Sequence, residues 1–207
     1  MKTALQPPEL SADEALARLL SGNERFCRGE PRSAVVRLET LADLARGQRP
    51  YATILGCSDS RVPPESIFDA GLGDLFVIRV AGNVFSPEIA GSLQYAGSHL
   101  QTPLFVVLGH EGCGAVQAAL ESKCQAAEHG SRIQILVNSI LPALAALDPG
   151  LPRTKLLSRA IENNVRWTVQ QIVNTPEGQA RVAEGRMKIV GAVYEIASGR
   201  VRFLNEQ

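Results

Sequence analysis

Three short, largely apolar segments in the middle of the chain constrain its fold most strongly. They span 52–55, 74–80 and 104–108, and helical patterns precede and follow the third of them. Continuous apolar strands that alternate with helices are typical of a parallel sheet covered on both faces. The sequence therefore predicts an α/β fold with a central, mostly parallel β-sheet flanked by helices.

The segments before this centre predict helices rather than strands. The pattern S-A-D-E at 11–14 is a capping box that opens a helix, and a second short helix is expected over 38–46. We interpret these two helices as an N-terminal helical arm over 1–48, followed by an α/β core over 49–207. No internal repeat or linker divides the sequence, so a single domain over 1–207 is predicted.

Beyond the centre, the patterns predict further helices and a closing pair of strands. The turn residues Ser198 and Gly199 separate the last two apolar segments and predict a C-terminal β-hairpin. The remaining expected elements are helices over 86–99, 115–123, 133–147 (interrupted by Pro142) and 154–173, and strands over 187–196 and 201–204.

Composition and charge restrict the classes of function. The 207 residues include 45% hydrophobic and 20% charged residues, as expected for a globular domain with a core. The 21 basic and 21 acidic residues cancel, which argues against a nucleic-acid partner. No apolar run is long enough to span a bilayer, so no membrane partner is expected. An N-terminus without an apolar signal core predicts a cytoplasmic protein.

Cysteine and histidine residues stand at the ends of two predicted strands. Cys57 follows the first strand, His110 follows the third, and Cys113 lies three positions further on, at the mouth of a helix. Open α/β sheets bind ligands at the carboxyl ends of their strands, so these residues are expected to meet. Two thiolates and an imidazole suit zinc, and three protein ligands leave the open position typical of a catalytic site. The sequence thus predicts one Zn²⁺ per chain.

An acidic and a basic residue accompany the first cysteine. Asp59 and Arg61 follow Cys57 at alternate positions, and an arginine can bind a carboxylate bidentately and keep it ionised. An ionised Asp59 accepts hydrogen bonds only, so it would orient an attacking water toward the substrate. The alternative interpretations are a surface ion pair for Asp59 and Arg61, and buried cysteines beside a loop histidine for the three ligands.

These residues resemble the β-class carbonic anhydrases, whose pattern is Cys-x-Asp-x-Arg followed further along by His-x-x-Cys. Here the pattern reads Cys57-Ser-Asp59-Ser-Arg61 and His110-Glu-Gly-Cys113. The likeness extends through 54–84 and 104–116 and, more weakly, over nearly the whole chain. The resemblance implies a carbonic anhydrase, which catalyses the zinc-dependent reversible hydration of carbon dioxide to bicarbonate and a proton.

The resemblance also implies substrate-binding positions and a partner. Gln48 is similar to a glutamine that reaches across a dimer to bound bicarbonate, and Phe76 and Tyr95 match aromatic positions near the cleft. Gly114 matches the glycine after the second cysteine. A homodimer, or a tetramer built from dimers, is therefore expected. Some bacterial members use a tryptophan for bicarbonate regulation at the position of Ile54. Arg79 and Tyr194 resemble the other residues of that pocket, but the missing tryptophan argues against this form of regulation.

Two other functions remain open from the sequence. The same fold could hydrolyse carbon disulfide or carbonyl sulfide. Alternatively, the chain could be a catalytically inactive, zinc-stabilised binding protein in which Asp59 occupies the fourth zinc position permanently. Proton transfer out of the site could use His99 or His129, although buffer or water could serve equally.

Overall fold

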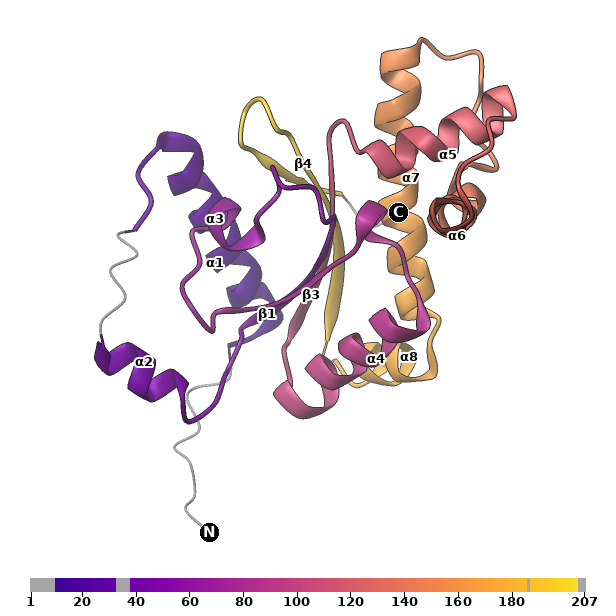
Figure 1. Ribbon diagram of the computed structural model, residues 1–207. Helices are drawn as coiled ribbons and strands as arrows, with labels where there is room; N and C mark the ends of the chain where they lie inside the picture. Colours follow the sequence, from indigo (N-terminus) through magenta and orange to yellow (C-terminus); the bar gives the residue numbers. More distant parts are fainter. Residues whose placement is uncertain (1–9, 33–37, 186, 205–207) are drawn as a thin grey trace.

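The structure is a computed structural model that describes residues 10–32, 38–185 and 187–204 (Figure 1). These residues form a five-stranded sheet in the order β2-β1-β3-β4-β5. The first four strands are parallel, and β5 runs antiparallel to β4. The strands are β1 (Ala52–Gly56), β2 (Leu75–Arg79), β3 (Leu104–His110), β4 (Lys188–Tyr194) and β5 (Val201–Phe203). The predicted mostly parallel α/β fold with a C-terminal β-hairpin is therefore confirmed.

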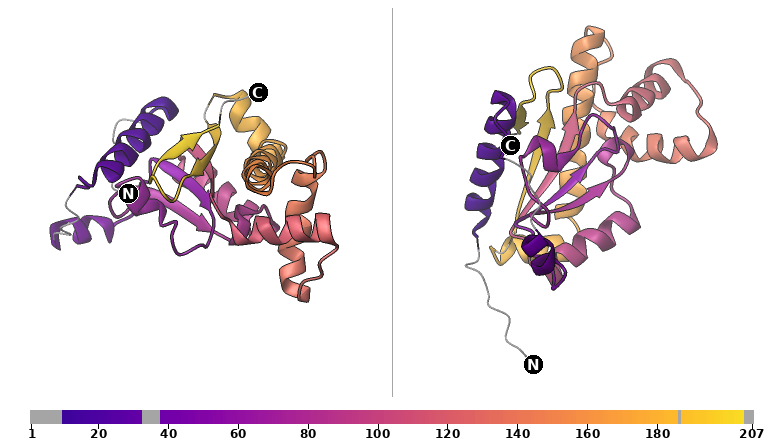
Figure 2. Two further views of the ribbon diagram at one scale, coloured as in Figure 1. Left: turned by 90° about the horizontal axis from the view of Figure 1, so that it is seen from above. Right: turned by 60° about the vertical axis from the view of Figure 1, so that its left-hand side comes forward.

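Helices cover both faces of the sheet, because each connection between parallel strands must cross one face (Figure 2). The helices are α1 (Ala12–Arg28), α2 (Leu38–Leu44), α3 (Pro64–Ile67), α4 (Pro87–Tyr95), α5 (Gly114–Gln125), α6 (Ser131–Ile140), α7 (Arg153–Val173) and α8 (Pro176–Ala183). Short 3₁₀ or π turns complete the order as η1 (Ala81–Asn83), η2 (Ala96–Leu100) and η3 (Leu141–Leu144).

Strand β3 shows why the central strands read as continuous apolar runs. Every residue of β3 is buried. Phe105 and Val107 join the apolar cluster that includes residues of α4, α5 and α7, whereas Val106 and Leu108 join the cluster that includes residues of α1. Alternate side chains of a strand point to opposite faces of the sheet. A strand that is covered on both faces therefore carries apolar residues at successive positions.

The first helix packs against the sheet of its own chain. Its capping box is formed as predicted, and Ala15 and Leu19 are completely buried. Asn23 fixes the helix by donating hydrogen bonds from Nδ2 to the carbonyl oxygens of Ile67 (3.1 Å) and Gly199 (2.8 Å). Within the described part of the segment expected as an arm, α1 is therefore docked on the sheet, whereas α2 lies to one side of it (Figure 1). Residues 1–9 and 33–37 lie outside the described residues.

Several element boundaries differ from those expected. Strand β3 continues through His110, so this histidine is the last residue of the strand rather than the first residue after it. The helices α3 and α8 were not predicted, since four residues are too few to show a helical period and α8 directly follows the longer α7. Among the described residues, no helix is long and apolar enough to cross a membrane.

Candidate metal centre

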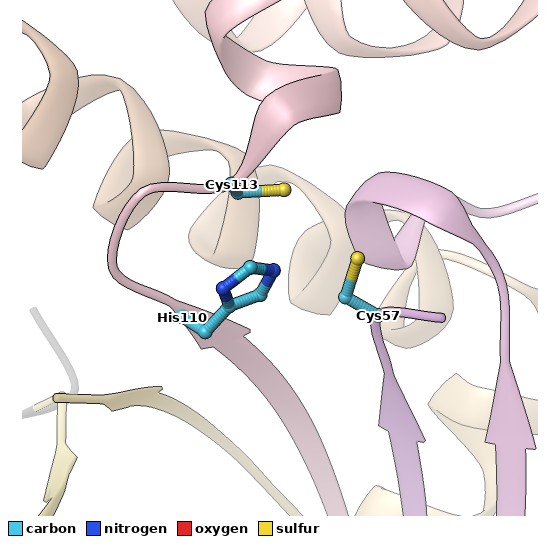
Figure 3. Close-up of side chains that lie close together, drawn as sticks. All are labelled: Cys57, His110 and Cys113. Carbon is cyan, nitrogen blue, oxygen red and sulfur yellow. The ribbon is translucent and has the colours of Figure 1, made fainter. Parts of the chain in front are cut away.

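Three elements bring the predicted ligands to one point. Cys57 directly follows β1, His110 ends β3, and Cys113 is the N-cap of α5. Strands β1 and β3 are neighbours in parallel register, with Gly56 opposite Leu108, so their carboxyl ends share one edge of the sheet. Figure 3 shows the two sulfurs and the imidazole turned toward each other. Their ligand atoms all lie within 4.8 Å of one another, and all three residues are buried.

The imidazole of His110 is oriented by the neighbouring peptide. Its Nδ1 lies 2.9 Å from the carbonyl oxygen of Glu111, which can only accept a hydrogen bond, so Nδ1 carries the proton. The other nitrogen, Nε2, then presents a lone pair toward the two sulfurs. Nε2 is fully buried and has no hydrogen-bond partner among the described residues. A buried acceptor without a partner is costly, and a metal ion would satisfy it.

The two thiols are close enough to influence each other's ionisation. A hydrogen bond with Cys113 lowers the pKa of Cys57, against the opposing effect of burial. The same hydrogen bond, together with burial, raises the pKa of Cys113. The pair therefore holds one negative charge readily, and a cation between the sulfurs would take the place of the shared proton. With the free Nε2 of His110, this donor set fits a zinc ion.

Asp59 lies beside the cluster and is held by Arg61. The guanidinium donates from Nε to Oδ1 at 2.9 Å and from Nη2 to Oδ2 at 2.7 Å, and the backbone N–H of Arg61 donates to Oδ1 at 3.0 Å. These hydrogen bonds, first among them those of the Arg61 side chain, lower the pKa of Asp59 well below its usual value. Asp59 Oδ2 is 3.9 Å from Nε2 of His110. An ionised carboxylate thus stands at the edge of the ligand cluster.

Arg79 fixes the backbone that carries Cys57 and Asp59, a contact that the sequence did not indicate. Its Nε donates to the carbonyl oxygen of Cys57 at 3.0 Å, and its Nη2 donates to that of Asp59 at 2.6 Å. The available signal was an arginine ending an otherwise apolar strand, where a charged side chain needs a partner.

The four expected substrate-binding residues take different positions. Gly114 begins α5, directly after Cys113. Gln48 is exposed between α2 and β1. Phe76 lies opposite Thr53, so its backbone stands about 13 Å along the strand direction from Cys57. The ring of Tyr95 is 6.0 Å from that of Phe76. Within one chain, only Gly114 directly adjoins the ligand cluster.

The two histidines considered for proton transfer have other contacts. The ring of His99 stacks on Tyr95 with a centroid distance of 4.9 Å. His129 Nε2 lies 3.1 Å from the carbonyl oxygen of Ala118. Neither contact connects the histidine to the ligand cluster.

A doubly covered, mostly parallel sheet with two cysteines and a histidine at its carboxyl edge defines a class of α/β protein with a candidate metal site. The sequence profile of the carbonic anhydrase family matches residues 52–201. The chain belongs to the carbonic anhydrase family, in its β class. It is 40% identical to carbonic anhydrase 2 of Mycobacterium tuberculosis, with 93% of each protein covered. It is 38% identical to the carbonic anhydrase of Mycolicibacterium smegmatis, with 94% of each covered.

Solved structures agree with this assignment. The fold matches a tetrameric β-carbonic anhydrase from Sordaria macrospora with a TM-score of 0.75 and 26% identity, over 91% of this chain and 96% of that one. It matches the Coccomyxa β-carbonic anhydrase solved with acetazolamide with a TM-score of 0.73 and 28% identity, over 91% and 86% of the two chains. The resemblance inferred from the sequence motifs is thereby confirmed.

Proposed function

We propose that this protein catalyses the reversible hydration of carbon dioxide to bicarbonate and a proton, with one zinc ion per chain held by Cys57, His110 and Cys113. The observation that carries the proposal is the buried cluster of ligand atoms within 4.8 Å of one another. Nε2 of His110, which finds no hydrogen-bond partner in the described part of the chain, supports a cation there. Membership of the carbonic anhydrase family supports the reaction.

Zinc, when bound, would acidify a water molecule and so supply a nucleophile near neutral pH. The residues of the chain position the reactants around it. Asp59, kept ionised by Arg61, accepts a hydrogen bond from the attacking water and orients its lone pair. Cys57 and Cys113 belong to the same apolar cluster as Val84 and Val116, which suits a nonpolar substrate.

The proposal also includes the expected substrate-binding residues, one of which acts through a second copy of the chain. Gln48 is exposed, and we infer that it reaches the site of a partner subunit in a homodimer or a tetramer of dimers. The aromatic pair of Phe76 and Tyr95 would line the approach to the cleft, and Gly114 would leave room for substrate beside Cys113.

The test is a stopped-flow assay of carbon dioxide hydration between about pH 6 and 9, with zinc measured on the same sample. We expect one zinc per chain and a rate that rises with pH. Full zinc occupancy without hydration at any pH would instead indicate a purely structural metal. Turnover of carbon disulfide or carbonyl sulfide in place of carbon dioxide would instead indicate a hydrolase of these sulfur compounds.

A further inference from the structure

A short buried turn contacts one of the candidate ligands through its backbone. The turn is η1, between β2 and α4, and the N–H of Gly82 donates to Sγ of Cys57 at 3.3 Å. Gly82 and Asn83 both have left-handed backbone conformations, with φ of 73° and 44°. A non-glycine residue in this region is strained, so the surrounding structure must hold the turn in place.

Helix α7 supplies two side-chain contacts to this turn. Asn164 donates from Nδ2 to the carbonyl oxygen of Gly82 at 2.8 Å, and Thr168 donates from Oγ1 to that of Asn83 at 3.2 Å. The two donors are four residues apart and so lie on the same face of α7. Asn164 is 1% exposed and Thr168 is fully buried.

A buried asparagine on this face needs an explanation. Its neighbours Ala160, Ile161 and Val165 belong to the apolar core, and burying an amide there is unfavourable unless its hydrogen bonds are made. Oδ1 of Asn164 has no hydrogen-bond partner among the described residues, so the amide is only half satisfied. An apolar residue of similar shape would serve packing better. The bond to Gly82 is therefore the feature that the asparagine specifically provides.

We propose that Asn164 and Thr168 are positioning residues that aim the Gly82 N–H at the Cys57 sulfur and thereby tune the metal centre. The inference rests on the proposed function, in which Cys57 is a metal ligand. A hydrogen bond to a ligand sulfur fixes its direction and withdraws charge from it, which sets both metal affinity and the electronic character of the bond. Helix α7 thus influences the metal site indirectly, through Gly82 and the Cys57 sulfur.

The first test uses Asn164→Leu and Thr168→Val, each of which removes the donor and keeps a similar shape. The readouts are zinc affinity by chelator competition and the sulfur-to-cobalt charge-transfer band of the protein loaded with Co²⁺. Loss of a partner behind a metal ligand typically weakens metal binding by 10–100-fold, and we expect about tenfold here because the effect passes through Gly82. The cobalt band should shift in both variants.

Two controls separate positioning from general destabilisation. Asn23→Leu removes another buried asparagine, which donates to the carbonyl groups of Ile67 and Gly199; neither of these residues belongs to the ligand cluster. This variant should unfold at a lower temperature yet keep the wild-type band and zinc affinity. Thr168→Ser retains a hydroxyl donor and should restore both properties lost in Thr168→Val.

Two results would overturn the inference. One is a wild-type band and zinc affinity in Asn164→Leu and Thr168→Val. The other is an equal change of the cobalt band and of zinc affinity in Asn23→Leu, which would show that a loss of stability alone causes the change. A wild-type protein that shows the cobalt band but does not hydrate carbon dioxide would refute only the proposed reaction. A wild-type protein without the band would refute the metal centre and the positioning role together.

Discussion

The proton on His110 is placed by the backbone of the next residue. Because the carbonyl oxygen of Glu111 accepts from Nδ1, the tautomer that exposes Nε2 toward the sulfurs of Cys57 and Cys113 is favoured before any metal arrives. Glu111 is itself fixed, since its backbone N–H donates to the carbonyl oxygen of Tyr194 at 2.9 Å. The ligand geometry is therefore preorganised by contacts within the chain.

Replacing any of the three candidate ligands should remove most of the metal. Cys57→Ala, His110→Ala and Cys113→Ala each leave two protein donors, and we expect little bound zinc and little hydration activity. Metal analysis alongside the hydration assay measures both. Cys27→Ala and Cys124→Ala are the matched controls, because both cysteines are exposed and lie outside the cluster. A Cys57→Ala protein with full zinc would refute the ligand assignment.

The ion pair of Asp59 and Arg61 predicts a separation of metal content from activity. Arg61→Ala frees Asp59, whose Oδ2 is 3.9 Å from the ligand atom of His110, to turn onto the metal position itself. We expect zinc to remain and hydration to fall by roughly tenfold or more, since the reacting groups lose their alignment. Arg159→Ala, which breaks a surface contact to Glu162, is the control. Wild-type rates in Arg61→Ala across the pH range would contradict this role.

At the scale of elements, helix α1 illustrates how a local signal and distant contacts combine. The side chain of Ser11 caps the first turn by accepting from the N–H of Glu14, and the side chain of Glu14 accepts from the N–H of Ser11. Ser11→Ala should lower the free energy of unfolding by about 1 kcal/mol. Urea denaturation measures the change. Ser158→Ala, on the exposed part of α7, should have a much smaller effect, and equal losses would contradict the capping argument.

At the scale of the whole molecule, Tyr51 links stability to alkaline pH. Tyr51, directly before β1, is 5% exposed, and burial raises the pKa of its hydroxyl to about 12. The unfolded chain releases this proton near pH 10, whereas the folded chain retains it. The contribution of the Tyr51 hydroxyl to the free energy of unfolding is therefore complete below about pH 10. It is lost progressively as pH rises toward 12, which lowers the free energy of unfolding by about 2–3 kcal/mol.

Tyr51→Phe should remove this part of the alkaline destabilisation. Urea denaturation at pH 8 and pH 11 compares the variant with the wild type, and the loss between the two pH values should be smaller in Tyr51→Phe. Tyr95→Phe is the matched control, because Tyr95 is 45% exposed. An unchanged pH dependence in Tyr51→Phe would show that other groups cause the loss.

The assembly of the molecule gives a further prediction. Leu38 and Leu41 of α2 are 83% and 44% exposed, close in sequence to Gln48. If this segment meets a second copy, sedimentation of the zinc-loaded protein should give a dimer or a multiple of it. Gln48→Ala should then weaken bicarbonate binding while the mass stays unchanged. A fully active monomer would contradict the proposed partner.

The sequence by itself determined the features that depend on local pattern and residue type. The α/β class followed from apolar runs such as that of β3, whose residues are buried on both faces. The candidate ligands followed from their positions at strand ends, and the capping box of α1 followed from four adjacent residues. Each of these signals lies within a short stretch of chain, so no knowledge of distant contacts was needed.

Only the tertiary structure decided the features that join residues far apart in the chain. Asn23 meets Gly199, and Asn164 meets Gly82, through single hydrogen bonds that leave no periodic trace in the sequence. These contacts join α1 to the turn of the C-terminal hairpin and α7 to the turn η1. A buried polar side chain finds its partner only once the elements pack, and that packing is decided by the whole chain at once.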